Sequence, residues 1–244
     1  MQPSAPSATA PAANELSSTE ERSAIGVSGL DLTTNHKASI SGRQLNRVST
    51  AHALTLLSAL LLALSFPDFD LWPLAWIGLA PLLVAITRRQ TPWRAFLSGW
   101  LAGTAFFYVT CYWLTYSMIH YGDLHPWQAY VVLIPGALVS GVFPALFALV
   151  LARALRRWGT SALLLAPVLW VSFEWGRLSV TGQLWNAIGY SQAFHPALIQ
   201  VARFGGVYAV GFLIVALNAA VAYALVRRTA RAAAWPRSSA PACL

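Results

Sequence analysis

Hydrophobic residues form long runs along most of this chain, and short polar stretches separate them. From Thr50 onward six apolar runs follow one another, spanning Ala51 to Phe66, Leu71 to Thr87, Ala95 to Met118, Trp127 to Leu155, Ser161 to Leu178 and Phe204 to Val226. A bilayer core is crossed by roughly 20 helical residues. The third, fourth and sixth runs reach this length, and the first two predict a tight helical hairpin around Pro67–Asp70. The pattern predicts an all-α, polytopic membrane helix bundle of about six transmembrane helices. Kinks are expected at Pro135, Pro144 and Pro167.

Basic residues mark every second connection between the runs. They are Lys37, Arg43 and Arg47; Arg88, Arg89 and Arg94; Arg153, Arg156 and Arg157; and Arg227, Arg228, Arg231 and Arg237. Six crossings place all four clusters on one side, and only Arg177 and Arg203 are basic in the loops opposite. Because cytoplasmic loops carry the excess of Lys and Arg, both ends of the chain are predicted to be cytoplasmic.

Composition supports a membrane location and divides the chain into three parts. The 244 residues are 57% hydrophobic and only 10% charged, with a net charge of +8, whereas soluble domains carry roughly 25% charged residues. The positive charges lie in scattered clusters between apolar runs, which argues against nucleic-acid binding. Residues 1–46 are polar and rich in small residues, so we expect a disordered cytoplasmic tail. Residues 47–230 form the transmembrane domain, and residues 231–244 form a second cytoplasmic tail.

The fifth run and the loop after it contain the side chains that are the best candidates for binding or catalysis. Glu174 and Arg177 are three residues apart and share a helical face. Charges within a membrane helix are costly unless they are paired or face a wet cavity, so the two form either a structural ion pair or a functional site. The polar and aromatic loop Thr181–Gln192 either anchors the chain at the membrane surface or dips inward to hold a lipid headgroup or lipidated peptide.

Other candidate motifs favour structural roles. Gly99 and Gly103 permit close helix packing, and His120, Asp123 and His125 lack the ligand set of a metal site. A nucleophilic cysteine needs a base and oxyanion donors. Cys111 has no His or carboxylate within a helical turn, Cys243 lies in the tail, and Lys37 is the single lysine. We therefore predict no catalytic residue, no metal and no cofactor.

Several motifs in a fixed order resemble the membrane portion of bacterial apolipoprotein N-acyltransferases, over about residues 50 to 230. They are Phe66-Pro67-Asp68-Phe69-Asp70-Leu71-Trp72-Pro73-Leu74-Ala75, Tyr112-Trp113-Leu114, the Glu174/Arg177 pair, Thr181-Gly182, Trp185-Asn186, Gly189-Tyr190-Ser191-Gln192 and Gly205-Gly206-Val207-Tyr208. One departure is Gln183-Leu184, where the family usually has Phe-Pro.

The resemblance implies a place in lipoprotein maturation at the bacterial inner membrane. In that family a periplasmic nitrilase-like domain with a Glu-Lys-Cys triad moves an acyl chain from phospholipid to the N-terminus of a diacylglyceryl-cysteine lipoprotein. The sequence ends at Leu244 without that domain. We therefore expect a fragment that cannot catalyse alone, with phospholipid and a lipoprotein as partners. It is either a truncated or frameshifted gene product or a half that works with a separately encoded nitrilase-like domain.

The resemblance also implies a set of substrate- or lipid-facing residues. They are Glu174, Arg177, Thr181, Trp185, Asn186, Tyr190, Gln192, Tyr112 and Trp113. The alternative is a non-enzymatic lipid-binding scaffold or small-solute transporter that uses the same outer loop.

Overall fold

Each apolar run becomes helical in the computed structural model, which describes residues 49–88 and 91–234. The first helix spans Ser49–Leu64. The others are η1 (Trp72–Leu74), α2 (Ala75–Gly78), α3 (Ala80–Thr87), α4 (Pro92–Thr110), α5 (Leu114–His120), α6 (Pro126–Trp158), η2 (Gly159–Leu165), α7 (Ala166–Thr181), η3 (Ile188–Gln192), α8 (Pro196–Ile199) and α9 (Ala202–Ala234). That part of the chain contains no strand. The tail predicted over residues 1–46 lies outside it, as does most of the tail predicted over residues 231–244.

Local sequence explains where the main helices begin and end. Thr91 caps α4 by accepting a hydrogen bond from the Arg94 N–H, and His125 and Gln128 form a reciprocal capping box on α6. Gly182, at φ 68°, closes α7 in the left-handed conformation that glycine adopts without strain. Pro167 lies in the first turn of α7 rather than inside the helix, so the kink predicted there is wrong. A first-turn proline gives up an N–H that would lack a helical partner anyway.

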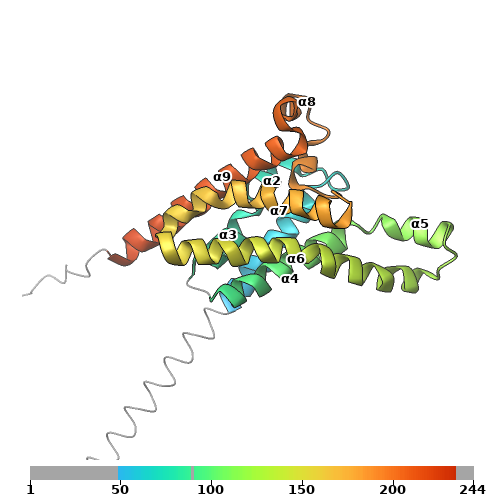
Figure 1. Cartoon of the computed structure of the whole chain (residues 1–244), viewed down its shortest axis with the longest axis horizontal. Helices are drawn as coiled ribbons and strands as arrows, with labels where there is room; N and C mark the ends of the chain where they lie inside the picture. The colour runs from blue at the N-terminus through green and yellow to red at the C-terminus, as the bar shows by residue number, and fades with distance from the viewer. Residues whose placement is uncertain (1–48, 89–90, 235–244) are drawn as a thin grey trace, which may run out of the picture. The chain divides into compact units, whose positions relative to one another are not determined.

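The closest helix pair is α4 against α6, which run side by side in Figure 1. Gly99 and Gly103 face Pro144, and Gly141 on α6 faces Thr104 on α4. A Cβ added at Gly99 would lie 2.5 Å from the Pro144 carbonyl oxygen. The glycine pair therefore packs two helices of the same chain, as close small-residue contacts in membranes do.

Length and composition identify two stretches able to cross a membrane, Pro126–Thr181 and Ala202–Ala230. The first contains both α6 and α7, which reverse direction at Gly159 and pack together in Figure 1. Ser49–Leu64 and Trp72–Thr87 are shorter apolar helices. The chain is thus an all-α membrane protein, and the count of six crossings stays a prediction.

Four of the predicted helices are interrupted. The second run divides into η1, α2 and α3, the fifth divides into η2 and α7, and the third and sixth each break once. The third run bends by 51° between α4 and α5, which together pass as one bent span, so its crossing of the membrane stays a prediction. In α9 the backbone leaves helical geometry at Gly205 and Gly206, the latter at φ 61°. Apolar composition continues through the bend between α4 and α5, which is why hydrophobicity alone did not reveal it.

Candidate functional site

Glu174 and Arg177 both reach from α7 to the loop that follows it. Their side chains are 7% and 4% exposed. The Ile188 N–H donates to Glu174 Oε1 over 2.8 Å, and Arg177 Nη1 donates to the Trp185 carbonyl oxygen over 2.8 Å. Within the described ranges no ion pair of 4.0 Å or less joins the two. The pair therefore holds the Thr181–Gln192 loop by its backbone, and the interpretation as a simple ion pair does not fit.

Asn186 connects the same loop to the bend after α4. Its backbone has a φ of 55°, a left-handed conformation that asparagine tolerates better than most residues. The Asn186 Nδ2 group donates to Thr110 Oγ1 over 2.7 Å and lies 3.2 Å from Cys111 Sγ. Loop 182–187 is thus fixed at both α7 and α4.

The second half of the loop packs onto α9 and the first hairpin. A Cβ at Gly189 would lie 2.5 Å from the Val207 carbonyl oxygen, so only glycine allows this approach. Gln192 is fully buried; its Oε1 accepts from Trp76 Nε1 over 3.3 Å, and its Nε2 donates to the Trp72 carbonyl over 3.2 Å. Buried polar groups satisfied across elements fix one arrangement of those elements.

The predicted aromatic site residues form an exposed rim around this loop. Trp113 and Trp185 meet edge to face with ring centroids 5.4 Å apart, and the Tyr112 hydroxyl donates to Asp68 over 3.3 Å. Tyr190 is 43% exposed. Thr181 bonds the Arg177 carbonyl within its own helix. Accordingly, Glu174, Arg177, Asn186 and Gln192 hold the loop from inside, and the aromatic residues lie on its outer surface.

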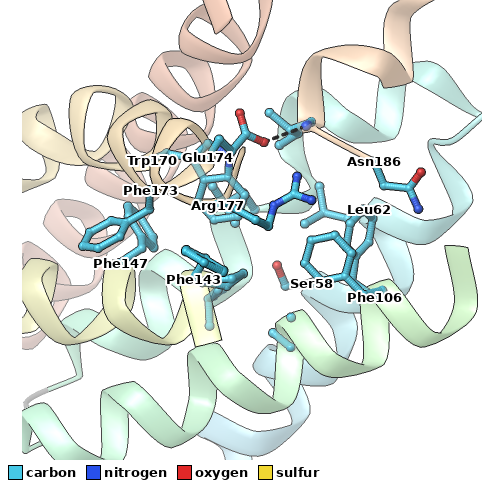
Figure 2. Close-up of a pocket in the computed structure, with 17 residues that line it drawn as sticks. Ser58, Leu62, Phe106, Phe143, Phe147, Trp170, Phe173, Glu174, Arg177 and Asn186 are labelled. Atoms are coloured by element: carbon cyan, nitrogen blue, oxygen red, sulfur yellow. Dashed lines mark hydrogen bonds between the residues drawn. The ribbon is translucent and has the colours of Figure 1, made fainter. Parts of the chain in front are cut away.

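An apolar cavity lies beneath the loop, in the interior of the bundle. It is bordered by Ser58, Leu62, Leu79, Leu82, Ala102, Gly103, Phe106, Phe107, Phe143, Pro144, Phe147, Trp170, Phe173, Glu174, Arg177, Asn186 and Ile188. Figure 2 shows Arg177 pointing into the space between these rings and Asn186. Glu174 Oε2 and Trp170 Nε1 are buried beside it, and the Trp170 side chain interacts with the Glu174 carboxylate. The cavity therefore combines an oily interior with a few polar atoms at one end.

Sequence analysis missed two features of this site. The phenyl rings lining the cavity come from helices α4, α6 and α7, and their convergence depends on packing. Asn218 of α9 was also missed, although a lone amide in an apolar run is a recognisable signal. It is fully buried and accepts from the Leu79 and Ala80 N–H groups over 2.8 and 2.9 Å, which fixes the break between α2 and α3. Among the described residues no cluster of His, Cys, Asp and Glu could hold a metal.

Comparison with known proteins identifies a family whose members match this chain across both the cavity and the loop. A family model described as the apolipoprotein N-acyltransferase N-terminal domain matches residues 58–220. An apolipoprotein N-acyltransferase of Geobacter metallireducens is 42% identical over 170 residues, which are 68% of this chain and 32% of the relative. The enzyme of Coxiella burnetii is 32% identical over 71% of this chain and 36% of its own length, and that of Vibrio parahaemolyticus is 34% identical over 68% and 33%. The chain spans about a third of the length of these relatives. It therefore belongs to the apolipoprotein N-acyltransferase family and corresponds to the N-terminal domain of its members.

Proposed function

We propose that this chain is the membrane domain of an apolipoprotein N-acyltransferase in the bacterial inner membrane. In this role it receives phospholipid and a diacylglyceryl-cysteine lipoprotein, and a nitrilase-like domain supplies the catalytic residues. Both ends lie in the cytoplasm. Supporting this orientation, the arginine-bearing ends of α6 and α9 lie on the same side of the bundle in Figure 1.

The observation that carries the proposal is the apolar cavity closed by the loop held by Glu174 and Arg177. Aromatic and aliphatic side chains bury an acyl chain favourably, by about 0.8 kcal/mol per CH₂ group. The guanidinium of Arg177 is a donor suited to an ester or phosphate oxygen. The space measures only about 40 Å³, so a single acyl chain, with its polar end toward Arg177, enters it as the lining phenyl rings move apart.

The chain's own residues carry out no acyl transfer under this proposal. A thioester intermediate requires a thiolate with a nearby base. Cys111 is buried and contacts the Asn186 amide, which cannot accept a thiol proton as a base does. Purified chain in phospholipid vesicles should therefore leave a synthetic diacylated lipopeptide unmodified by mass spectrometry. Formation of an N-acylated lipopeptide would contradict this part of the proposal.

Occupancy of the cavity is tested by lipid extraction from the purified chain. We expect co-purified phospholipid in the wild type and about fivefold less in Phe143→Trp, because overfilling a packed space costs about 1 kcal/mol or more. The matched control is Val139→Trp, which adds the same ring at a 55% exposed position on the same helix. Equal lipid content in all three proteins would overturn the assignment of the cavity.

A further inference from the structure

A second apolar groove lies at the opposite ends of the helices from the Thr181–Gln192 loop. It runs between the first helix, α3 and α9, and it is lined by Leu54, Leu61, Ile77, Ala80, Pro81, Val84, Thr87, Arg88, Val221, Leu225, Val226 and Thr229. The groove holds about 1110 Å³ of empty space, its open side included. None of its lining residues borders the cavity described above.

The dimensions of the groove match one leaflet of a bilayer. Its wall on α9 extends from Val221 to Thr229. At 1.5 Å per helical residue this is about 12 Å. The hydrocarbon core is about 30 Å thick, so one leaflet contributes roughly 15 Å. The groove is therefore long enough for the part of an acyl chain nearest its headgroup.

Charge and polarity are confined to one end of the groove. Arg88 is exposed there, next to Thr87 and close to Thr229. Over residues 49–88 and 91–234 no carboxylate forms an ion pair with Arg88. The carboxylates in those ranges are Asp68, Asp70, Asp123 and Glu174, which belong to the other end of the bundle. Among the residues that the structure describes, the positive charge at this end thus has no carboxylate partner.

We propose that this groove binds one anionic phospholipid from the leaflet that faces the arginine-rich ends of the helices. Its phosphate lies at Arg88, and an acyl chain lies along Leu61, Val84 and Leu225. Basic pockets between membrane helices on the cytoplasmic side are known to hold anionic headgroups. Free phosphate would leave the apolar walls exposed, and a zwitterionic headgroup brings its own cation to the basic end of the helices, which weakens its net attraction to Arg88. This site does not depend on the function proposed above.

The test measures binding of phosphatidylglycerol and phosphatidylcholine to the purified full chain, by native mass spectrometry and thermal unfolding. We expect one phosphatidylglycerol retained per chain and a higher unfolding temperature with this lipid than with phosphatidylcholine. Arg88→Gln should weaken phosphatidylglycerol binding about fivefold, the equivalent of about 1 kcal/mol for one arginine near the membrane surface. The matched control is Arg157→Gln, an exposed arginine outside the groove, which should keep wild-type binding.

A third variant distinguishes lipid binding in the groove from diffuse electrostatic attraction of lipid to the basic surface. Val84→Trp fills the groove without changing its charge, so retention of both lipids should fall while Arg88 stays in place. The site would be overturned by equal losses in Arg88→Gln and Arg157→Gln, by no preference between the two lipids, or by unchanged retention in Val84→Trp.

Discussion

At the residue scale, Asn218 contributes to the fold through all of its side-chain hydrogen-bonding groups. It accepts from two N–H groups at the start of α3, and its Nδ2 donates to the Ala75 and Ile214 carbonyls over 2.8 and 2.9 Å. Asn218→Leu leaves these buried groups unpaired. We expect a loss of about 1 to 3 kcal/mol in the free energy of unfolding, measured by denaturation in mixed micelles.

The control for this prediction is Thr55→Val. Thr55 is equally buried, but its hydroxyl bonds only the Ala51 carbonyl of its own helix. Because that carbonyl keeps its helical partner, we expect a change below about 1 kcal/mol. Equal losses in the two variants would show that Asn218 does not stabilise the break between α2 and α3.

Glu174 holds the loop through a single acceptor oxygen, so substitutions can test this hydrogen bond separately from the negative charge. Glu174→Gln keeps an oxygen for the Ile188 N–H, whereas Glu174→Leu removes it. A hydrogen bond to a charged group is worth about 1.5 to 3 kcal/mol. We therefore expect amide hydrogen exchange in residues 182–192 to accelerate about tenfold or more in Glu174→Leu, and much less in Glu174→Gln.

Exchange elsewhere provides the internal control. Residues 126–158 of α6 do not depend on this hydrogen bond, so their exchange should match the wild type in both variants. If Glu174→Gln accelerates the loop as strongly as Glu174→Leu, the charge rather than the bond to Ile188 holds the loop. A uniform acceleration over the whole chain would indicate general unfolding.

At the scale of elements, the contact between α4 and α6 depends on the absence of a side chain at Gly99. Gly99→Ala places a Cβ 2.5 Å from the Pro144 oxygen and 2.9 Å from the Ala145 Cα, both backbone atoms. The helices must separate, and we expect a destabilisation of about 1 to 3 kcal/mol in the same unfolding measurement. The Cβ added by Gly136→Ala on α6 has no neighbouring atom within 4 Å, so we expect the free energy of unfolding to stay unchanged. A harmless Gly99→Ala would show that the two helices can shift apart freely.

The existence of the helices could be predicted from the sequence, but their interruptions could not. Long apolar runs indicate helices because a membrane requires backbone groups to be satisfied internally. The bend at residues 111–113 depends on contacts from Asn186, which lies 75 residues further along the chain. The break before α3 likewise depends on Asn218. Such contacts are set by packing between distant residues and leave no periodic signal.

At the scale of the whole molecule, the sequence pointed to the loop and missed the cavity beneath it. Glu174 and Arg177 stood out because charges are rare in apolar helices, and their partners, the Ile188 N–H and the Trp185 carbonyl, are backbone groups that any residue type provides. The cavity is lined by phenyl rings from several helices. In the sequence each of these rings looks like an ordinary core residue. The charged residues of the site can therefore be predicted from the sequence, whereas the shape of the cavity depends on how the helices pack.

The orientation of the bundle is best tested on α6, because this helix is longer than the membrane is thick. Its 33 residues extend about 50 Å at 1.5 Å per residue, against a hydrocarbon core of about 30 Å. Both ends therefore reach water. With Cys111 and Cys243 changed to serine, an impermeant maleimide should label Asp123→Cys in intact spheroplasts and Trp158→Cys only after lysis. Labelling of Trp158→Cys in intact spheroplasts would reverse the orientation and contradict the cytoplasmic placement of the arginine clusters.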